Sequence, residues 1–279
     1  MDNIDLERLR QASFIKEVEW HESIASTNDR GVTLAGEAVL VTPRLIIAGE
    51  QTAGRGRGGN RWWSSAGALT FSLVFDPHGD LAARGSPRLE IDRWPRVALT
   101  AGVALCDVLA DIIPDVPCRL KWPNDVQLDG KKLAGILVDV PPADPEGRRR
   151  VVLGMGINVN NSLKTAPPEI QVVGAALCDA LGNSFDATEL LLAWLNRFAD
   201  RLKELALDDQ SLPDRWRSLC ALTGTTVALQ SGNRAIRGLC RGIDRDGALL
   251  VETANGPERL YAGVHVRAGI ADATVPLRQ

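Results

Sequence analysis

Residues 49–75, GEQTAGRGRGGNRWWSSAGALTFSLVF, place a glycine- and arginine-rich segment directly before a β-rich run. Glycine lets backbone N–H groups approach a ligand closely, and arginine offers a permanent charge with a fork of donors that matches phosphate or carboxylate. GRGRGG (54–59) formally matches the G-x-G-x-x-G dinucleotide fingerprint, but that fingerprint needs a helix after it. The run that follows, ALTFSLVF (68–75), alternates as a strand does. The stretch therefore predicts an anion site on a loop between strands and excludes a Rossmann fold.

The rest of the chain predicts an α+β protein with a mixed β-sheet. Runs of β-rich residues indicate strands, and apolar residues at helical spacing indicate helices. The expected strands are 15–20, 44–50, 68–75, three short strands within 118–140 with a turn at Asp129-Gly130, and 148–161; the expected helices are 28–36, 96–113, 169–182 and 186–205. This mixture favours a sheet that helices cover on one face.

The pattern changes near Leu222. From there, short strands are divided by the turn sequences SGN, DRDG and NGP, which predicts a small all-β, barrel-like module. We therefore expect two domains, at 1–220 and 221–279.

Composition and charge exclude several classes of protein. Of the 279 residues, 45% are hydrophobic and 24% are charged, as in ordinary globular proteins, and the formal net charge of −3 does not suit a nucleic-acid binder. The basic run Arg148-Arg149-Arg150 is interpreted as a solvated hairpin edge. No apolar run is long enough to span a bilayer and the N-terminus is unlike a signal peptide, so we expect a cytoplasmic protein with no membrane partner. The five cysteines form no C-x-x-C pair, so we expect free thiols and no zinc site.

Three further stretches place polar or charged residues at the ends of expected strands. They are KWPNDV (121–126), GKKLAGILVD (130–139) and GMGINVNN (154–161). Taken alone, GRGRGG is equally compatible with a solvated surface turn, and the asparagines of the other stretches with turn formation. Polar residues at several strand ends more often mark a site.

These stretches, together with ASTN (25–28) and QTAGRGRGGNRWWS (51–64), resemble biotin protein ligase, also called biotin–[acetyl-CoA-carboxylase] ligase or holocarboxylase synthetase. The resemblance covers about 15–279 and includes the SH3-like β domain at the C-terminus. It implies the class II synthetase-like fold of biotin and lipoate ligases. It also implies ATP-dependent attachment of biotin to a lysine of a biotin carboxyl carrier domain, in acetyl-CoA carboxylase or a related carboxylase. Biotinyl-adenylate is the implied intermediate, and Mg²⁺ is expected to arrive on the substrate phosphates.

The resemblance also assigns tasks to individual residues. Those expected to act in catalysis are Arg57, Lys121 and Lys132. Those expected to bind biotin are Ser26, Thr27, Asn28, Gln51, Gly54, Arg55, Gly56, Arg57, Lys132, Gly135 and Gly154. Those expected to bind ATP or the adenylate are Arg55, Arg57, Trp62, Lys121, Asn124, Asp125 and Asn158. Trp63 is interpreted as a core residue, and no residue is assigned to a dedicated metal site.

Two departures from the familiar pattern narrow the prediction. Repressor-type members have an arginine where this chain has Asn60, which leaves the strength of adenylate binding open. The expected first strand begins at residue 15, which leaves too little chain before it for the DNA-binding winged helix of those members. We therefore expect a monofunctional ligase, monomeric or homodimeric, without a nucleic-acid partner. The rival interpretations are a lipoate ligase of the same fold and a biotin-binding sensor without turnover.

Overall fold

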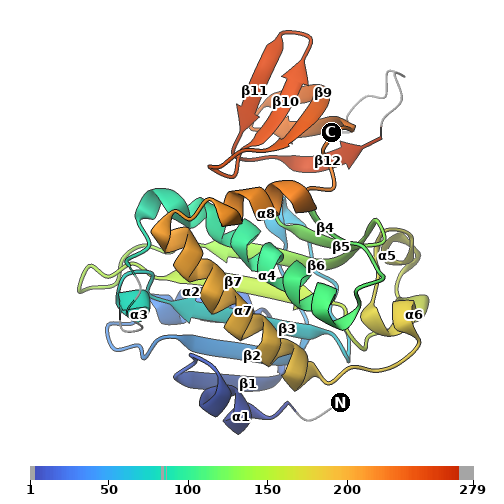
Figure 1. Cartoon of the computed structure of the whole chain (residues 1–279). Coiled ribbons are helices and arrows are strands. Elements are labelled where there is room, and N and C mark those ends of the chain that lie inside the picture. Colours follow the sequence, from blue (N-terminus) through green and yellow to red (C-terminus); the bar gives the residue numbers. More distant parts are fainter. Residues whose placement is uncertain (1–3, 83–84, 86, 270–279) are drawn as a thin grey trace.

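A computed structural model describes residues 4–82, 85 and 87–269; the remaining residues of the two expected domains lie outside this description. Its larger sheet has seven strands (Figure 1). Their spatial order is β1 (Glu17–Ile24), β2 (Arg44–Gln51), β3 (Leu69–Phe75), β7 (Val151–Ile157), β6 (Lys131–Asp139), β5 (Asp125–Leu128) and β4 (Cys118–Lys121). β1 and β2 are parallel, and every other neighbouring pair is antiparallel. The prediction of a mixed sheet is confirmed.

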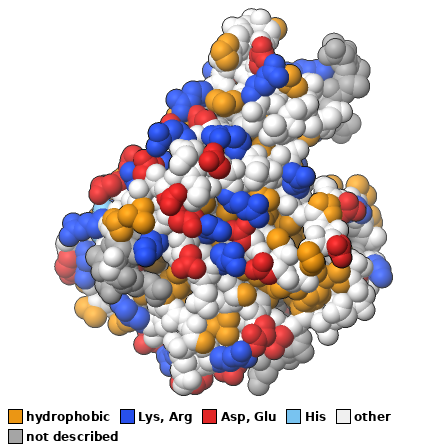
Figure 2. Space-filling view, in the orientation of Figure 1, with side chains coloured by type: hydrophobic (Ala, Val, Ile, Leu, Met, Phe, Trp, Pro, Cys, Tyr) orange, Lys and Arg blue, Asp and Glu red, His pale blue; other side chains and the backbone are white. Residues whose placement is uncertain are grey.

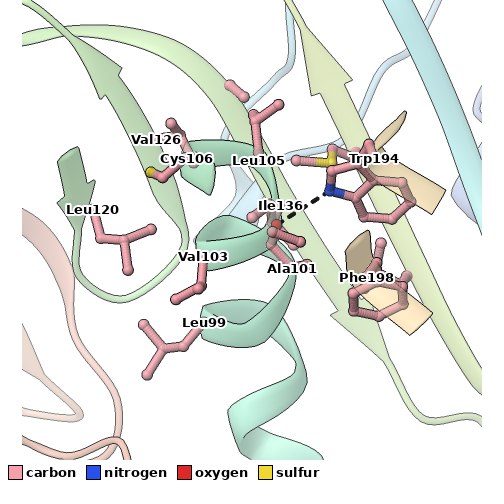
Figure 3. Packing of buried hydrophobic residues seen from close by; sticks show 14 of the residues in the cluster. Leu99, Ala101, Val103, Leu105, Cys106, Leu120, Val126, Ile136, Trp194 and Phe198 are labelled. Atoms are coloured by element: carbon pink, nitrogen blue, oxygen red, sulfur yellow. Dashed lines mark hydrogen bonds between the residues drawn. The ribbon is translucent and has the colours of Figure 1, made fainter. Parts of the chain in front are cut away.

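Helices α4 (Val97–Ile112) and α7 (Ala187–Leu207) lie together over one face of this sheet (Figure 1). Asp186 caps α7 by accepting hydrogen bonds from two backbone amides of its first turn. Between the two helices, the indole N–H of Trp194 donates to the carbonyl of Ala101 at 3.2 Å (Figure 3). The same indole stacks on Phe198 with ring centroids 4.9 Å apart. This face holds most of the hydrophobic core.

The opposite face carries α2 (Thr27–Ala35), so the prediction that helices cover only one face was wrong. Side chains alternate across a sheet, and the residues that contact α2 are the alternate ones, Ile46, Val74 and Val152. Gly31 permits the close packing, because a Cβ there would lie 2.7 Å from Val152. The N-terminus of α2 is thereby brought next to the central strands.

The helix predicted at 169–182 is broken into α5 (Pro168–Val173) and α6 (Leu177–Leu181). The break occurs because the intervening backbone bonds to other elements. Gly174 bridges to Lys132, and the amide of Ala175 donates to the Lys132 carbonyl at 2.9 Å. The amide of Leu177 donates to the carbonyl of Asn158 at 3.1 Å. Tertiary hydrogen bonds have overridden the local helical pattern.

The second sheet is antiparallel, with the order β11 (Gly256–Leu260), β10 (Leu249–Thr253), β9 (Arg234–Ile243), β8 (Thr226–Ser231) and β12 (Val264–Ala268). It stands at one end of the larger sheet (Figure 1), and we call it the C-terminal domain. The helices not predicted are α1 (Leu6–Ala12), α3 (Gly79–Ala82), α8 (Ser211–Leu219) and the 3-10 turns η1 (Arg57–Gly59), η2 (Ile91–Arg96) and η3 (Leu163–Thr165). The predicted small β module is confirmed.

The basic run at 148–150 is only partly solvated, so its interpretation as a solvated edge was wrong for Arg150. That side chain is buried, lies 3.1 Å from Asp144 and donates to the carbonyls of Ala35 and Glu37. It joins the start of β7 to the end of α2. Elsewhere basic and acidic side chains are interspersed on the face shown in Figure 2.

Candidate functional site

A pocket of about 240 Å³ lies beneath the glycine loop, which we define as residues 54–61. Its walls come from the start of α2, the central strands, the 121–125 turn and the C-terminal domain. Of the sequence-predicted residues, those that line it are Ser26, Thr27, Asn28, Gln51, Arg55, Gly56, Arg57, Trp62, Lys121, Asn124, Asp125, Lys132, Gly135 and Gly154. Stretches far apart in the sequence thus meet around one cavity.

Gly54 and Asn158 do not line this pocket, and both support its walls. A Cβ at Gly54 would lie 2.6 Å from the carbonyl oxygen of Trp62, so only glycine fits there. The side chain of Asn158 is buried; its Nδ2 atom donates to the carbonyl of Ala175 at 3.0 Å, and its Oδ1 atom accepts from Nδ2 of Asn161 at 2.9 Å. It fixes the chain that follows β7.

One end of the pocket is a buried polar network, which we call the ring end. Ser26 caps α2, accepting from the backbone amide of Asp29 at 3.3 Å. The Oε1 atom of Gln51 accepts from the backbone amide of Thr27 at 2.7 Å and from its hydroxyl at 3.0 Å. Ser72 donates toward Thr27 Oγ1 at 2.8 Å. Because each group is held by another, this end is preorganised.

Asn28 extends this network toward β6 and β7. Its Nδ2 atom donates to Asp139 Oδ2 at 2.6 Å, and its Oδ1 atom lies 3.2 Å from the Ser72 hydroxyl. A Cβ at Gly154 would lie only 2.3 Å from Asn28 Oδ1. Glycine on β7 therefore makes room for the amide.

The glycine loop folds back on itself. The amide of Gly56 donates to the carbonyl of Asn60 at 2.7 Å, and the amide of Trp62 donates to the carbonyl of Gly54 at 3.0 Å. Gly58 and Gly59 have φ values of 66° and 79°, a region that favours glycine. The two glycines thus allow the tight turn that brings both ends of the loop together.

The two predicted loop arginines point to different partners. Arg55 Nη1 lies 2.6 Å from Asp29 Oδ1 and 3.3 Å from Asp139 Oδ2, and the hydrogen bond to Asp29 raises the pKa of Arg55. Arg57 Nη1 donates to the carbonyl of Gly263 at 2.8 Å. Burial lowers the pKa of Arg57 below its ordinary value, while the charge of Asp125 opposes this shift. An arginine remains cationic at neutral pH, so a partly buried positive charge faces the pocket.

Two lysines face the pocket from the other wall. Lys121 ends β4, and Lys132 Nζ lies 2.7 Å from Asp125 Oδ1. The same ammonium lies 5.8 Å from the centre of the Trp62 ring, within reach of a cation–π contact. Together with Arg57, these lysines concentrate positive charge at what we call the cationic end.

Trp62 packs closely against β6 and β7 at two glycines. A Cβ at Gly156 would lie 2.3 Å from its indole, and one at Gly135 would lie 3.3 Å away. The indole N–H is buried and has no hydrogen-bond partner among the described residues. The indole donor is therefore left unpaired in this conformation of the described residues.

Asn124 lines the pocket but directs its amide into the protein, donating to the carbonyl of Ile136 at 2.7 Å. This bond ties the KWPN turn to β6. The side chain of Trp63 is partly buried against Leu163 and Ala166, in keeping with its interpretation as a core residue.

Sequence reasoning missed Thr70, Ser72, Asp139, Gly263 and Val264. Thr70 and Ser72 are the polar members of an alternating strand, which is a signal that could have been used. Asp139 closes the GKKLAGILVD stretch. Gly263 and Val264 line the pocket from the C-terminal domain, and no local sequence pattern indicates that contact.

Two absences hold for the residues that the structure describes. No group of three or more His, Cys, Asp or Glu side chains could hold a metal ion among them. None of the described helices has the length and apolar character to cross a membrane. All five cysteines are free.

Comparisons with known proteins agree with this geometry. Residues 20–158 match the Biotin/lipoate A/B protein ligase family, and residues 223–264 match the biotin protein ligase C-terminal domain. The biotin–[acetyl-CoA-carboxylase] ligase of Mycobacterium tuberculosis is 31% identical, with 87% of this chain and 86% of that protein covered. The ligase of the same name from Paracoccus denitrificans is 30% identical, with 81% and 93% covered.

The chain also aligns with 71% of the bifunctional ligase/repressor BirA of Bacillus subtilis, at 29% identity over 87% of its own length. The solved structure of the biotin protein ligase from Aquifex aeolicus in complex with biotin and ATP superposes with a TM-score of 0.74, at 28% identity, covering 91% of this chain and 99% of that one. The family predicted from the motifs is confirmed: the chain belongs to the biotin protein ligases of the Biotin/lipoate A/B protein ligase family.

Proposed function

We propose that this protein activates biotin with ATP and transfers it to a lysine of a biotin carboxyl carrier domain. The observation that carries the proposal is a single pocket with two chemically different ends. Thr27, Asn28 and Gln51 offer fixed donors and acceptors that suit a ureido ring, and Arg57, Lys121 and Lys132 offer positive charge. A carboxylic acid with a polar ring at its far end fits this arrangement, and biotin is such an acid.

In the first step, an oxygen of the biotin carboxylate attacks the α-phosphorus of ATP. The bond from that phosphorus to the bridging oxygen breaks, and pyrophosphate leaves. Two anions must meet, so fixed cations at the α-phosphate lower the barrier. Arg57, Lys121 and Lys132 would supply these charges, with Asp125 orienting Lys132 through their 2.7 Å ion pair.

In the second step, the neutral amine of the acceptor lysine attacks the acyl carbon of the adenylate. The carbon–oxygen bond to AMP breaks, the amine loses a proton and an amide forms. Water would also hydrolyse the mixed anhydride, so the glycine loop above the pocket would protect it. We place the acceptor on a biotin-dependent carboxylase and the reaction in the cytoplasm, where free thiols stay reduced.

Mg²⁺ is assigned to the substrate. Mg²⁺ usually binds through substrate phosphates and one or two carboxylates. The Asp125 carboxylate lines the pocket, and carboxylate oxygens are ligands of the right kind. We propose that the ion enters with ATP and adds positive charge at its phosphates.

The test is exchange of labelled pyrophosphate into ATP with Mg²⁺ and either biotin or lipoate. Exchange with biotin alone is expected. Exchange with lipoate alone would show that lipoate, and not biotin, is the substrate. Biotin binding without exchange would favour a biotin-binding sensor.

A matched pair of lysine variants locates the chemistry within this assay. Lys132→Gln should lower the exchange rate by about 10²–10³-fold, because it removes a preorganised charge from the transition state. Lys131→Gln, at the exposed neighbouring position outside the pocket, should leave the rate unchanged. Equal effects of the two variants would remove Lys132 from the proposed mechanism.

A further inference from the structure

Asp139 occupies the junction between the ring end and the glycine loop. Its Oδ2 atom accepts from Asn28 Nδ2 at 2.6 Å and from Arg55 Nη1 at 3.3 Å. Asn28 lies in the buried first turn of α2, whereas Arg55 belongs to the loop that covers the pocket. One carboxylate oxygen therefore contacts both parts of the site.

The carboxylate also decides how the amide of Asn28 is turned. An ionised carboxylate only accepts hydrogen bonds, so the NH₂ group of Asn28 must face Asp139. Asn28 Oδ1 then faces Ser72 and Gly154, where it presents an acceptor to the ring end. Asn28 is 4% exposed, so it has no free choice of solvent partners.

We propose that Asp139 is a positioning residue for biotin recognition, which couples occupation of the ring end to closure of the glycine loop. Asp139 turns the Asn28 side chain so that its Oδ1 atom can accept a hydrogen bond from a ureido N–H of biotin. Through its contact with Arg55, Asp139 also holds the glycine loop next to the Asn28 side chain. The inference rests on the proposed function, because it assumes that the ring of biotin fills this end.

Asp29 provides the matched control. Its carboxylate makes the shorter contact to Arg55, at 2.6 Å, but it does not contact the Asn28 amide. Asp29→Asn therefore weakens the hold on Arg55 and leaves Asn28 in place. Asp139→Asn disturbs both, because an amide at 139 can present NH₂ where only an acceptor was available.

The experiment measures biotin affinity by calorimetry without ATP, for the full chain and for Asp139→Asn, Asp139→Glu and Asp29→Asn. Asp139→Asn should weaken biotin binding about tenfold or more, the range for hydrogen bonds to charged groups. Asp29→Asn should change it by less than about threefold, on the scale of an exposed ion pair. Asp139→Glu keeps an acceptor-only group and should recover part of the affinity.

Limited proteolysis of the glycine loop with trypsin supplies a second readout. Biotin should protect the loop in the unchanged protein and in Asp29→Asn, but not in Asp139→Asn.

Unchanged affinity and protection in Asp139→Asn would overturn the proposal. Equal losses of biotin affinity in Asp29→Asn and Asp139→Asn would mean that Asp139 acts only through its ion pair with Arg55, and would contradict its proposed effect on Asn28. Should Asp139→Asn fail to fold, Asp139→Glu with neither weakened binding nor altered protection would still contradict coupling through this short contact. A protein that binds no biotin at all would overturn the proposed function itself.

Discussion

Two glycines of β7 leave room for different groups at the site. Gly154 faces the amide of Asn28, and Gly156 faces the indole of Trp62. In both cases an added Cβ would lie 2.3 Å from the neighbouring side chain, which is closer than atoms can pack. The two positions therefore test the two ends of the pocket separately.

We expect Gly154→Ala to weaken biotin binding about tenfold, because it displaces Asn28, and to leave ATP binding largely unchanged. Gly156→Ala should raise the KM for ATP by a similar factor and leave biotin affinity largely unchanged, because it displaces Trp62. Calorimetry with biotin and exchange kinetics at varied ATP separate the two effects. Identical profiles for the two variants would show that Trp62 does not serve the nucleotide.

At the scale of elements, an aromatic cluster packs α7 against the sheet, and a hydrogen bond from the same cluster ties α7 to α4. Trp194 is fully buried and stacks on Phe198 (Figure 3). Its ring centroid lies 5.0 Å from that of Phe71 on β3. Trp194→Ala should lower the free energy of unfolding by about 3–5 kcal/mol, because it opens a large cavity and removes the bond to Ala101. Urea denaturation measures this loss.

Trp20→Ala is the control for that loss, because Trp20 is 38% exposed on β1. Its cost should stay near 1 kcal/mol, the average for substitutions. Equal losses of unfolding free energy at the two tryptophans would mean that the packing of Trp194 between α4 and α7 contributes less to stability than its burial indicates.

How far each element could be predicted depends on the reach of its contacts. The turn at Asp129-Gly130 was predictable, because both residues adopt positive φ and the Asp-Gly pair favours that conformation. The break between α5 and α6 was not, because Ala175 bonds to Lys132 across the fold. The spacing of hydrophobic residues indicates a helix, but it carries no information about hydrogen bonds between that segment's backbone and distant parts of the chain.

The same reasoning separates the predicted from the missed parts of the site. Loop arginines and strand-end lysines carry their chemistry in the residue type, so the sequence indicates them. Asp139 lies 111 positions from Asn28 in the chain, and the packing of α2 against the sheet brings the two together. Its place in the site depends on that tertiary packing, which motifs do not record.

At the scale of the whole molecule, the C-terminal domain forms part of the wall of the pocket. The indole N–H of Trp122 donates to the carbonyl of Gly247 at 3.1 Å, and Val264 lies 2.9 Å from where a Cβ of Gly58 would stand. The carbonyl of Gly263 accepts from Arg57. The glycine loop is thus held from both domains.

Gly263→Ala tests this arrangement without removing a domain. The added Cβ would lie 2.9 Å from the fully buried Trp122 ring and 3.0 Å from Leu229, so the segment before β12 must move and Arg57 loses its anchor. We expect pyrophosphate exchange to fall about tenfold and the free energy of unfolding to fall by about 1–3 kcal/mol. Biotin affinity should change by less than about threefold, because α2, β2, β3, β6 and β7 build the ring end.

Gly36→Ala is the control, because Gly36 has an ordinary helical conformation and its Cβ would meet nothing closer than 3.5 Å. Exchange and stability should be unaffected by it. If Gly263→Ala instead left exchange intact while lowering stability, the C-terminal domain would support the fold without positioning Arg57. If it weakened biotin binding as strongly as exchange, the ring end would depend on the C-terminal domain, contrary to the separation of the two ends argued above.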